Sequence, residues 1–373
     1  MTLVPRRLAR GVRSHWATSS LALLLPLAAA CIRQPPGAAS ASLDGTPDGR
    51  EPATQEQKPS PKHLYVQGRQ LFDRCGEPVV LRGINEMVIW TAPEGQTFPE
   101  IAKTGANTVR VVWTVKDHPG EAQLDRVLSR AIAEKLIPII ELHDATGNLA
   151  GVPQVVEFWV RPEIVAVLKK HEQSLLLNIA NEAGSAVQLA DYVSTYTSAI
   201  TKLRGAGLEL PLMIDAPGWG QDVDTLQAAA PALMQADPQR NLLFSVHMWW
   251  SKGASSDDPG STKRIRAEIE ESVALNLPLV IGEFAHAGVG CSRSIDYATI
   301  LTEAQRAGIG WLAWSWGPGN RDCNEMDMTT GGTFETLQGW GLEVSVSHPA
   351  SIQKTSKIPA SMARGECAVQ LGG

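Results

Sequence analysis

The sequence lacks the short motifs that mark most metal and nucleotide sites. Its five cysteines form no Cys-x-x-Cys pair, and His171-Glu172 has no second histidine at the spacing of a zinc-protease helix. The turn Gly83-Ile84-Asn85-Glu86, which follows the first apolar run of the folded part, is not the glycine-rich turn of a dinucleotide site. We therefore expect a protein without a metal or a cofactor.

An excess of positive charge is also missing. The formal net charge is −6, and four arginines lie in an acid-free stretch of the first thirty residues, so the rest of the chain is more acidic still. Such a surface repels phosphates, which argues against nucleic acid as a partner. Tyrosine is scarce, with four Tyr against eleven Trp. Tryptophan packs well in cores, and it is also a flat platform for a sugar ring.

One apolar run precedes the folded part, around Leu21–Leu27, and its length of about ten residues suits a signal peptide rather than a membrane span. Three alanines then lead to Cys31, as in a bacterial lipoprotein cleavage box. We predict a lipoprotein-type signal peptide at 1–30 and lipidation of Cys31. The protein is then exported and held to a membrane only through that lipid; a secreted protein with an ordinary signal peptide is the alternative. Residues 31–62, rich in Pro, Gly, Ala, Ser and charge, are predicted to be a disordered linker.

From residue 63 onward, short β-branched runs alternate with amphipathic stretches. A hairpin is predicted over 64–81, helices over 121–135 and 187–207, and buried strands at 137–140, 175–177 and 279–281. Polar or aromatic residues end eight successive apolar runs, about one strand-plus-helix unit apart: Asn85, Arg110, His143, Glu182, Asp215, His247, Glu283 and Trp316. This pattern predicts an α/β fold, a (β/α)8 TIM barrel, whose eight mouth residues converge. We expect one catalytic domain at 63–362, the hairpin closing the barrel bottom, and a tail at 363–373; a doubly wound open sheet is the rival.

Two carboxylates among the eight suggest chemistry. Glu182 and Glu283 belong to the fourth and seventh units, and a separation near 5 Å would suit retaining glycoside hydrolysis. Arg110 could keep one glutamate ionised as the nucleophile, while a less compensated setting would raise the pKa of the other, the proton donor. Asn181 can hydrogen-bond a sugar 2-hydroxyl. A charge on the buried run that ends in Asn181-Glu182 needs such a reason.

The remaining mouth residues have weaker assignments. His143 and His247 could be satisfied core histidines or substrate contacts. Trp219 and Trp316 are candidate sugar platforms, whereas Trp311 and Trp314 are expected to pack between the barrel and its helices. Asp144 and Asp215 are expected to be loop or supporting groups rather than catalysts.

The motifs in order resemble glycoside hydrolase family 5, and within it the bacterial β-mannanases of subfamily 8. The matching stretches are LRGIN (81–85), IAKTGANTVR (101–110), LHDATG (142–147), NIANE (178–182), GWGQ (218–221), FSVHMW (244–249), VIGEF (280–284) and GWLAWSW (310–316). The resemblance implies Glu182 as acid/base, Glu283 as nucleophile, and substrate-site roles for Arg110, His143, Asn181, His247 and Trp316. Three positions depart from the family: Trp249 replaces a tyrosine that hydrogen-bonds the nucleophile, Glu86-Met87-Val88 replaces a histidine-containing stretch, and Ala183-Gly184 replaces an aromatic.

The leading interpretation is a monomeric, retaining endo-β-1,4-mannanase that acts on β-linked polysaccharide and binds it through Asn85, Trp219 and Trp249 as well. An endo-β-1,4-glucanase and a glycan-binding surface lipoprotein without turnover are the alternatives. Because a closed barrel brings its chain ends together and sets neighbouring mouth loops side by side, we predict the disulfides Cys75–Cys367 and Cys291–Cys323.

Overall fold

The computed structural model describes residues 62–252, 260–365 and 367. The predicted signal peptide at 1–30, the lipidated Cys31 and nearly all of the predicted linker lie outside these residues and stay predictions. Among the described helices, none is long and apolar enough to cross a membrane.

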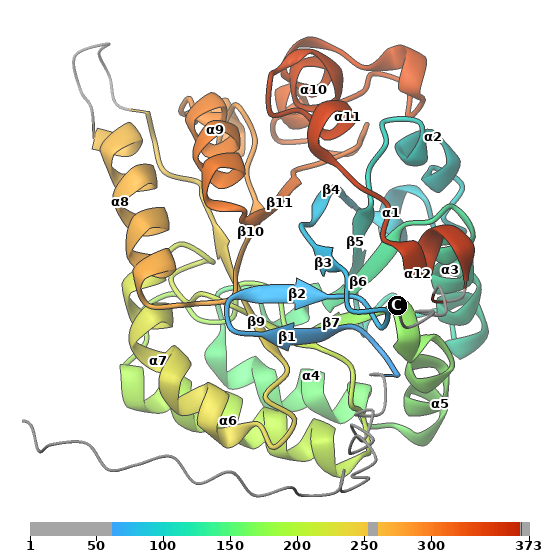
Figure 1. The fold of residues 1–373 in the computed structure, drawn as a ribbon, viewed down its shortest axis with the longest axis vertical. Coiled ribbons are helices and arrows are strands. Elements are labelled where there is room, and N and C mark those ends of the chain that lie inside the picture. The colour runs from blue at the N-terminus through green and yellow to red at the C-terminus, as the bar shows by residue number, and fades with distance from the viewer. Residues whose placement is uncertain (1–61, 253–259, 366, 368–373) are drawn as a thin grey trace, which may run out of the picture. The chain divides into compact units, whose positions relative to one another are not determined.

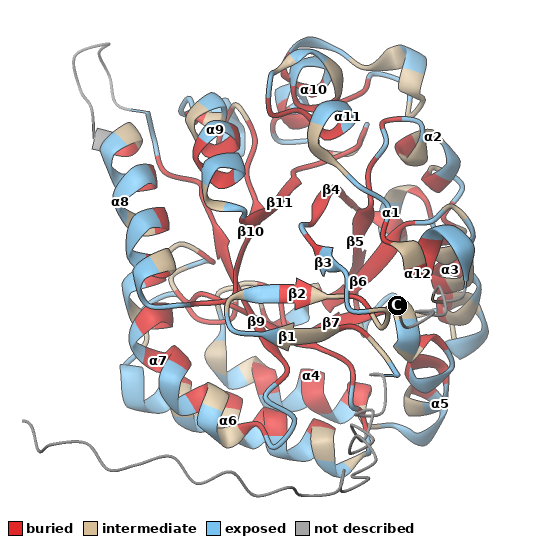
Figure 2. Ribbon diagram, viewed as in Figure 1, coloured by how far each residue is buried: buried red, intermediate tan, exposed pale blue. Residues whose placement is uncertain are grey.

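Eight parallel strands close into a barrel in the order β10-β11-β4-β5-β6-β7-β8-β9, so the predicted (β/α)8 barrel is confirmed. The strands are short and almost entirely buried, because helices cover them outside and side chains fill the interior (Figure 2). Their bounds are β4 Arg82–Glu86, β5 Thr108–Trp113, β6 Ile137–Leu142, β7 Leu176–Asn178, β8 Leu212–Asp215, β9 Leu242–His247, β10 Leu279–Glu283 and β11 Gly310–Ala313.

The helices follow the apolar periodicity of the sequence. The helices predicted over 121–135 and 187–207 are α3 (Glu121–Ala133) and α6 (Leu189–Gly205). Each buries most of its predicted apolar face, but Leu189, at the start of α6, is 43% exposed. The others are α1 Val88–Thr91, α2 Phe98–Ala102, α4 Val152–Trp159, α5 Pro162–His171, α7 Val223–Ala236, α8 Gly260–Ala274, α9 Tyr297–Ala307, α10 Gly339–Leu342, α11 Ile352–Thr355 and α12 Ala360–Arg364.

A small antiparallel sheet covers the amino-terminal end of the barrel. It has three strands, β1 (Tyr65–Gln67), β2 (Gln70–Phe72) and β3 (Pro78–Val79), where one hairpin was predicted. The additional turn is Gly68-Arg69, where Gly68 has φ of 59°. Figure 1 shows β1 and β2 crossing in front of the barrel strands. Leu64, Leu71 and Val79 pack there in one cluster with barrel residues such as Ile139 and Leu243, so the predicted closure of the barrel bottom is confirmed.

Both predicted disulfides are present. Cys75 and Cys367 join the first sheet to the segment after α12, with Cα atoms 5.2 Å apart, and Cys291 and Cys323 lie 5.1 Å apart. The second bridge ties the loop after β10 to the loop after β11. Both loops rise at the carboxyl ends of neighbouring strands, where a barrel forms its active site.

Candidate active site

A cleft of about 1160 Å³ opens at the carboxyl ends of the strands. Five predicted site residues line it: His143, Glu182, Trp219, Trp249 and Glu283. Residues of α1 and of the loops that the sequence did not single out for binding complete its walls: Met87, Ile89, Trp90, Thr91, Asp117, Gln221, Val289, Arg293, Trp314, Pro318, Gly319, Asn320, Arg321, Asp322 and Met326.

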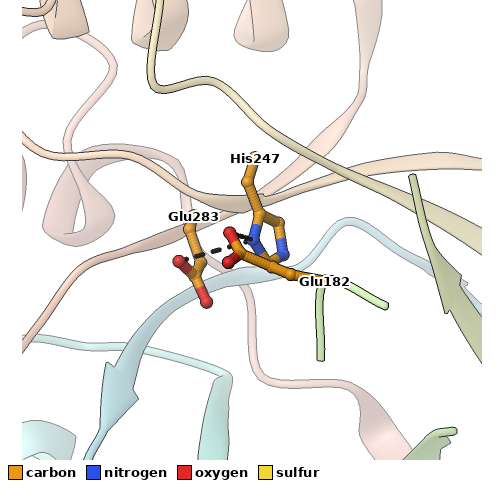
Figure 3. Close-up of side chains that lie close together, drawn as sticks. All are labelled: Glu182, His247 and Glu283. Atoms are coloured by element: carbon orange, nitrogen blue, oxygen red, sulfur yellow. Dashed lines mark hydrogen bonds and ion pairs between the residues drawn. The ribbon is translucent and has the colours of Figure 1, made fainter. Parts of the chain in front are cut away.

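Glu182 and Glu283 converge at this cleft with His247 beside them (Figure 3). Glu283 ends β10 and His247 ends β9, while Glu182 follows the end of β7 by four residues. Carboxylate oxygens of the two glutamates and a ring nitrogen of His247 all lie within 4.8 Å of one another. Two carboxylates and a histidine at these distances could bind a cation. The positive charge of Arg110, which donates to Glu283, disfavours cation binding there. An approach this close fits a retaining glycosidase rather than an inverting one, whose carboxyl groups lie further apart.

Glu283 is surrounded by donors. Its Oε1 accepts from Nη1 of Arg110 at 2.9 Å, and its Oε2 accepts from the indole Nε1 of Trp249 at 3.3 Å. Nδ1 of His247 lies 3.4 Å from the same Oε2. Burial raises the pKa of Glu283 to about 7, the charges of His247 and Arg110 act to lower it, and that of Glu182 acts to raise it. These donors partly offset the effect of burial, so that a share of Glu283 is ionised near neutral pH.

Arg110 is fully buried inside the barrel, and five acceptors surround it. Besides Glu283, its guanidinium donates to four side-chain oxygens, those of Asn85 at 3.1 Å, Asn178 at 3.0 Å, Asn181 at 2.7 Å and Asp215 at 3.4 Å. A buried guanidinium with every direction filled is rigid, so it presents Nη1 to Glu283 in a fixed orientation.

Glu182 has a different environment. Its Oε1 is 2.7 Å from Nδ1 of His247, and its backbone N–H donates to Oδ2 of Asp215 at 3.1 Å. The Glu182 backbone has φ of 45°, a left-handed conformation that is unusual for a residue with a Cβ. Its carbonyl accepts from the N–H of Gly147 at 2.9 Å. Backbone bonds on both sides thus hold Glu182 in a conformation that it would not adopt alone.

The structure reverses the positions predicted for Trp314 and Trp316. Trp316 was expected to be a sugar platform, but its side chain is 0% exposed and its indole N–H donates to the carbonyl of Gly332, so that prediction is wrong. Trp314, expected to pack outside the barrel, lines the cleft instead and stacks beside His143 with the ring centroids 6.0 Å apart. Trp311 is buried as expected.

Among the described residues, the two exposed tryptophans lie on the cleft walls. Trp219, predicted as a platform, is 48% exposed, and a Cβ at Gly147 would lie 2.4 Å from its ring, so the indole rests directly on that backbone. Trp90, which the sequence did not single out, is 49% exposed, donates to Asp117 and meets the His143 ring edge-on. Both offer flat apolar surface to a sugar ring.

Several predicted contacts lie one layer deeper than expected. Asn85 does not face the cleft: its amide donates to the carbonyls of Gly282 and Ala313, and its oxygen accepts from Arg110, so direct substrate binding by Asn85 was a wrong prediction. Arg110, Asn181 and His247 are also fully buried, where they contact the lining side chains. The Asn181 amide donates to Thr146 and lies 3.3 Å from Nε2 of His143.

Three buried polar residues that sequence analysis missed or undervalued support the site. Glu141 accepts from Nδ1 of His143 at 2.9 Å. Burial acts to lower the pKa of His143, but the charge and hydrogen bond of Glu141 together with the charge of Glu283 raise it above its usual value. Asn178 bridges Arg110 and Asp215. Glu141, Asn178 and Asp215 are each a polar side chain on an otherwise apolar strand, and this signal in the sequence could have indicated all three. Sequence analysis used it only for the glutamates at the mouth.

The family model described as cellulase (glycosyl hydrolase family 5) matches residues 72–320. The mannan endo-1,4-beta-mannosidase of Salipaludibacillus agaradhaerens is 33% identical over 300 residues, which cover 79% of this chain and 94% of that protein. A β-mannanase of Thermomonospora fusca, solved in complex with mannohexaose, has a TM-score of 0.72 at 31% identity over 81% of this chain and 100% of that one. A β-mannanase from Streptomyces thermolilacinus gives 0.72 at 34%, over 80% and 99% of the two chains.

A parallel barrel with two glutamates in an open cleft at its carboxyl end defines a glycoside hydrolase. The chain belongs to glycosyl hydrolase family 5, and the resemblance drawn from its motifs is confirmed.

Proposed function

We propose that this protein is a retaining endo-β-1,4-mannanase in which Glu283 is the nucleophile and Glu182 the acid/base. The approach of the two carboxylates to within 4.8 Å carries the mechanism. Mannan is supported by the names of the relatives that match nearly their whole length. An open cleft with exposed indoles on its walls suits internal positions of a long chain, hence endo action.

The contacts of the two glutamates support their different roles. Glu283 has the guanidinium and an indole N–H, which favour a carboxylate ready to attack, whereas Glu182 has no arginine contact among the described residues. In the first step Glu182 gives its proton to the glycosidic oxygen while a Glu283 oxygen bonds the anomeric carbon and the leaving chain departs. In the second step the Glu182 carboxylate takes a proton from water, the water oxygen bonds that carbon, and Glu283 is released.

The free-energy cost of placing the Glu182 and Glu283 carboxylates so close together supports hydrolysis rather than passive glycan binding. Two carboxylates this close repel one another, and burial raises the pKa of Glu283 to about 7. A protein that only binds sugars has no use for that arrangement. Endoglucanase activity remains the enzymatic alternative.

A reducing-sugar assay on soluble mannan, β-1,4-glucan and xylan tests the proposal, with Glu283→Gln as the matched inactive control. We expect release from mannan in excess of the other two and none from the variant. Preference for glucan would replace the substrate assignment, and binding without turnover of any of the three would leave the glycan-binding protein.

We also propose that the protein is exported and anchored through a lipid on Cys31, and that it is a monomer. Export and the lipid anchor are supported by the sequence before residue 63: an arginine-bearing start, a short apolar run, three alanines before Cys31 and a polar linker. Fractionation of cells that express the full chain tests the anchor. Wild type should sediment with membranes, and Cys31→Ala should not; light scattering of the soluble variant should give one chain per particle.

A further inference from the structure

Asp215 ends β8 and is fully buried, and its side chain lies beside Glu182 and His247. Its Oδ1 accepts from Asn178 at 3.0 Å, and its Oδ2 accepts from Nη2 of Arg110 at 3.4 Å and from the backbone N–H of Glu182 at 3.1 Å. The same Oδ2 lies 3.6 Å from Nε2 of His247. Burying an isolated carboxylate costs free energy. The contacts of Asp215 together compensate its negative charge more fully than Arg110 alone would.

Asp215 reaches Glu182 by two routes. The first is the backbone bond that holds the left-handed conformation of Glu182, whose φ is 45°. The second runs through the His247 ring, whose Nε2 faces Asp215 while Nδ1 lies 2.7 Å from Oε1 of Glu182. Within the described part of the chain, the buried Nε2 of His247 makes no hydrogen bond, and Oδ2 of Asp215 at 3.6 Å is the carboxylate oxygen that it faces.

We propose that Asp215 is a positioning residue for catalysis, which holds the Glu182 backbone and keeps both nitrogens of His247 protonated. His247 then donates through Nδ1 to Oε1 of Glu182. With that oxygen occupied as an acceptor, the catalytic proton resides on Oε2, the oxygen left to face the glycosidic bond. The inference rests on the proposed role of Glu182 as acid/base.

The charges around His247 agree with this arrangement. Burial acts against its protonation, but the carboxylates of Glu283, Asp215 and Glu182 outweigh it and raise the pKa of His247 to about 9. Imidazolium is the form below its pKa. Loss of the Asp215 charge should therefore lower that pKa and let His247 lose its proton at a lower pH. The other charged groups of the network are Arg110 on β5, whose positive charge opposes a second cation at His247, and Glu141 on β6, whose charge acts to raise the pKa of Arg110.

The test compares Asp215→Asn with Asp237→Asn. Asp237 is also a fully buried aspartate paired with an arginine, since it accepts two bonds from Arg204, but it lies after α7 at the opposite end of that helix from the cleft loop. Both variants lose one buried charge. Only Asp215→Asn should lower kcat on polysaccharide, by about 10-fold to 100-fold at nearly constant KM, as expected for impaired general acid catalysis. Its basic limb of kcat/KM should move by about one pH unit to lower pH.

A dinitrophenyl β-glycoside separates proton donation from general damage, because its leaving group departs without a proton. On that substrate kcat/KM of Asp215→Asn should stay within about threefold of wild type. Equal losses on both substrates, or an unmoved basic limb, would overturn the proposal.

If the variant does not fold, ¹⁵N NMR of histidine-labelled wild type decides: both His247 nitrogens should carry protons at pH 7.5, and a neutral ring overturns the proposal. A wild-type enzyme that cleaves glucan and not mannan would overturn only the substrate assignment, and the comparison is then made on glucan.

Discussion

The indole Nε1 of Trp249 lies 3.3 Å from Oε2 of Glu283, the carboxylate proposed to attack the sugar. In the family, the hydroxyl of a tyrosine at this position hydrogen-bonds the nucleophile. In this chain the indole N–H of Trp249 is the donor to Glu283 instead. The ring also lines the cleft beside the scissile position. Of the two outcomes that the substitution allowed, a replacement donor or a less stabilised nucleophile, the structure shows the first.

Trp249→Phe keeps the ring and removes the donor, so it should lower kcat more than it raises KM. A hydrogen bond to a charged group contributes about 1.5–3 kcal/mol, which corresponds to a loss of about 10-fold to 100-fold. Trp250→Phe is the control, because that ring packs against Arg264. Steady-state kinetics on soluble mannan gives the answer, and unchanged kcat in Trp249→Phe would reduce Trp249 to a wall of the cleft.

Azide should distinguish the two glutamates. In Glu182→Ala the glycosyl-enzyme lacks its base, and azide can attack it directly, so turnover should recover with formation of a β-glycosyl azide. In Glu283→Ala no covalent intermediate forms, and azide should not restore a product of retained configuration. NMR of the products reports the anomeric configuration, and inversion by the wild type would exclude the double-displacement mechanism.

The acid limb of the pH profile should reflect Glu283. Burial raises its pKa to about 7, and only the ionised form attacks, so kcat/KM should fall as the pH drops below about 7. The two glutamates interact, so the observed value belongs to the pair. Arg110→Lys, which retains the charge but loses the fixed fork, should shift this limb further upward. An acid limb centred near 4.5 would show that the donors around Glu283 cancel its burial completely.

Trp314 and Trp316 should differ in their kinetics. Trp314→Ala removes the surface that lines the cleft beside His143, so kcat/KM should fall by about tenfold or more. Because Trp314 is also largely buried and its indole N–H donates to Asn320, the same variant should lose about 3–5 kcal/mol of unfolding free energy. Trp316→Phe loses the buried bond to the Gly332 carbonyl and should cost about 1 kcal/mol of stability, with nearly normal kinetics. Denaturant titrations alongside kinetics measure both; the reverse result would return Trp316 to the substrate site.

The Cys291–Cys323 bridge should matter for both stability and binding. It closes a segment with a sequence separation of 32, so replacing both cysteines by serine should cost about 3–4 kcal/mol in the chain-entropy model. Since Val289 and Arg321 from the two tied loops line the cleft, KM should rise as well. Replacing Cys75 and Cys367 should lower stability alone, because that bridge joins the first sheet and the chain end. Equal KM in both double variants would show that the cleft loops keep their positions without the bridge.

The sequence by itself determined the barrel, its order of units and the convergence of Glu182 and Glu283. Apolar periodicity placed α3 and α6 within two residues of their bounds, because the buried face of a helix must repeat with the helical period. Buried runs ending in Glu182, His247 and Glu283 predicted convergence, since parallel strands in a closed barrel end at one rim. Closure also brought together the two cysteine pairs.

Only the tertiary structure decided which side chains face the cleft and which support it. β11 ends at Ala313, so Trp314 and Trp316 lie beyond the regular alternation of a strand, and packing against His143 and Gly332 sets their directions. The sequence placed Asp215 at the mouth and indicated a supporting group, but it could not show which residues Asp215 contacts, because Arg110, Glu182 and His247 belong to three other strand units. Long-range contacts of this kind form only when the barrel closes, and no local pattern in the sequence encodes them.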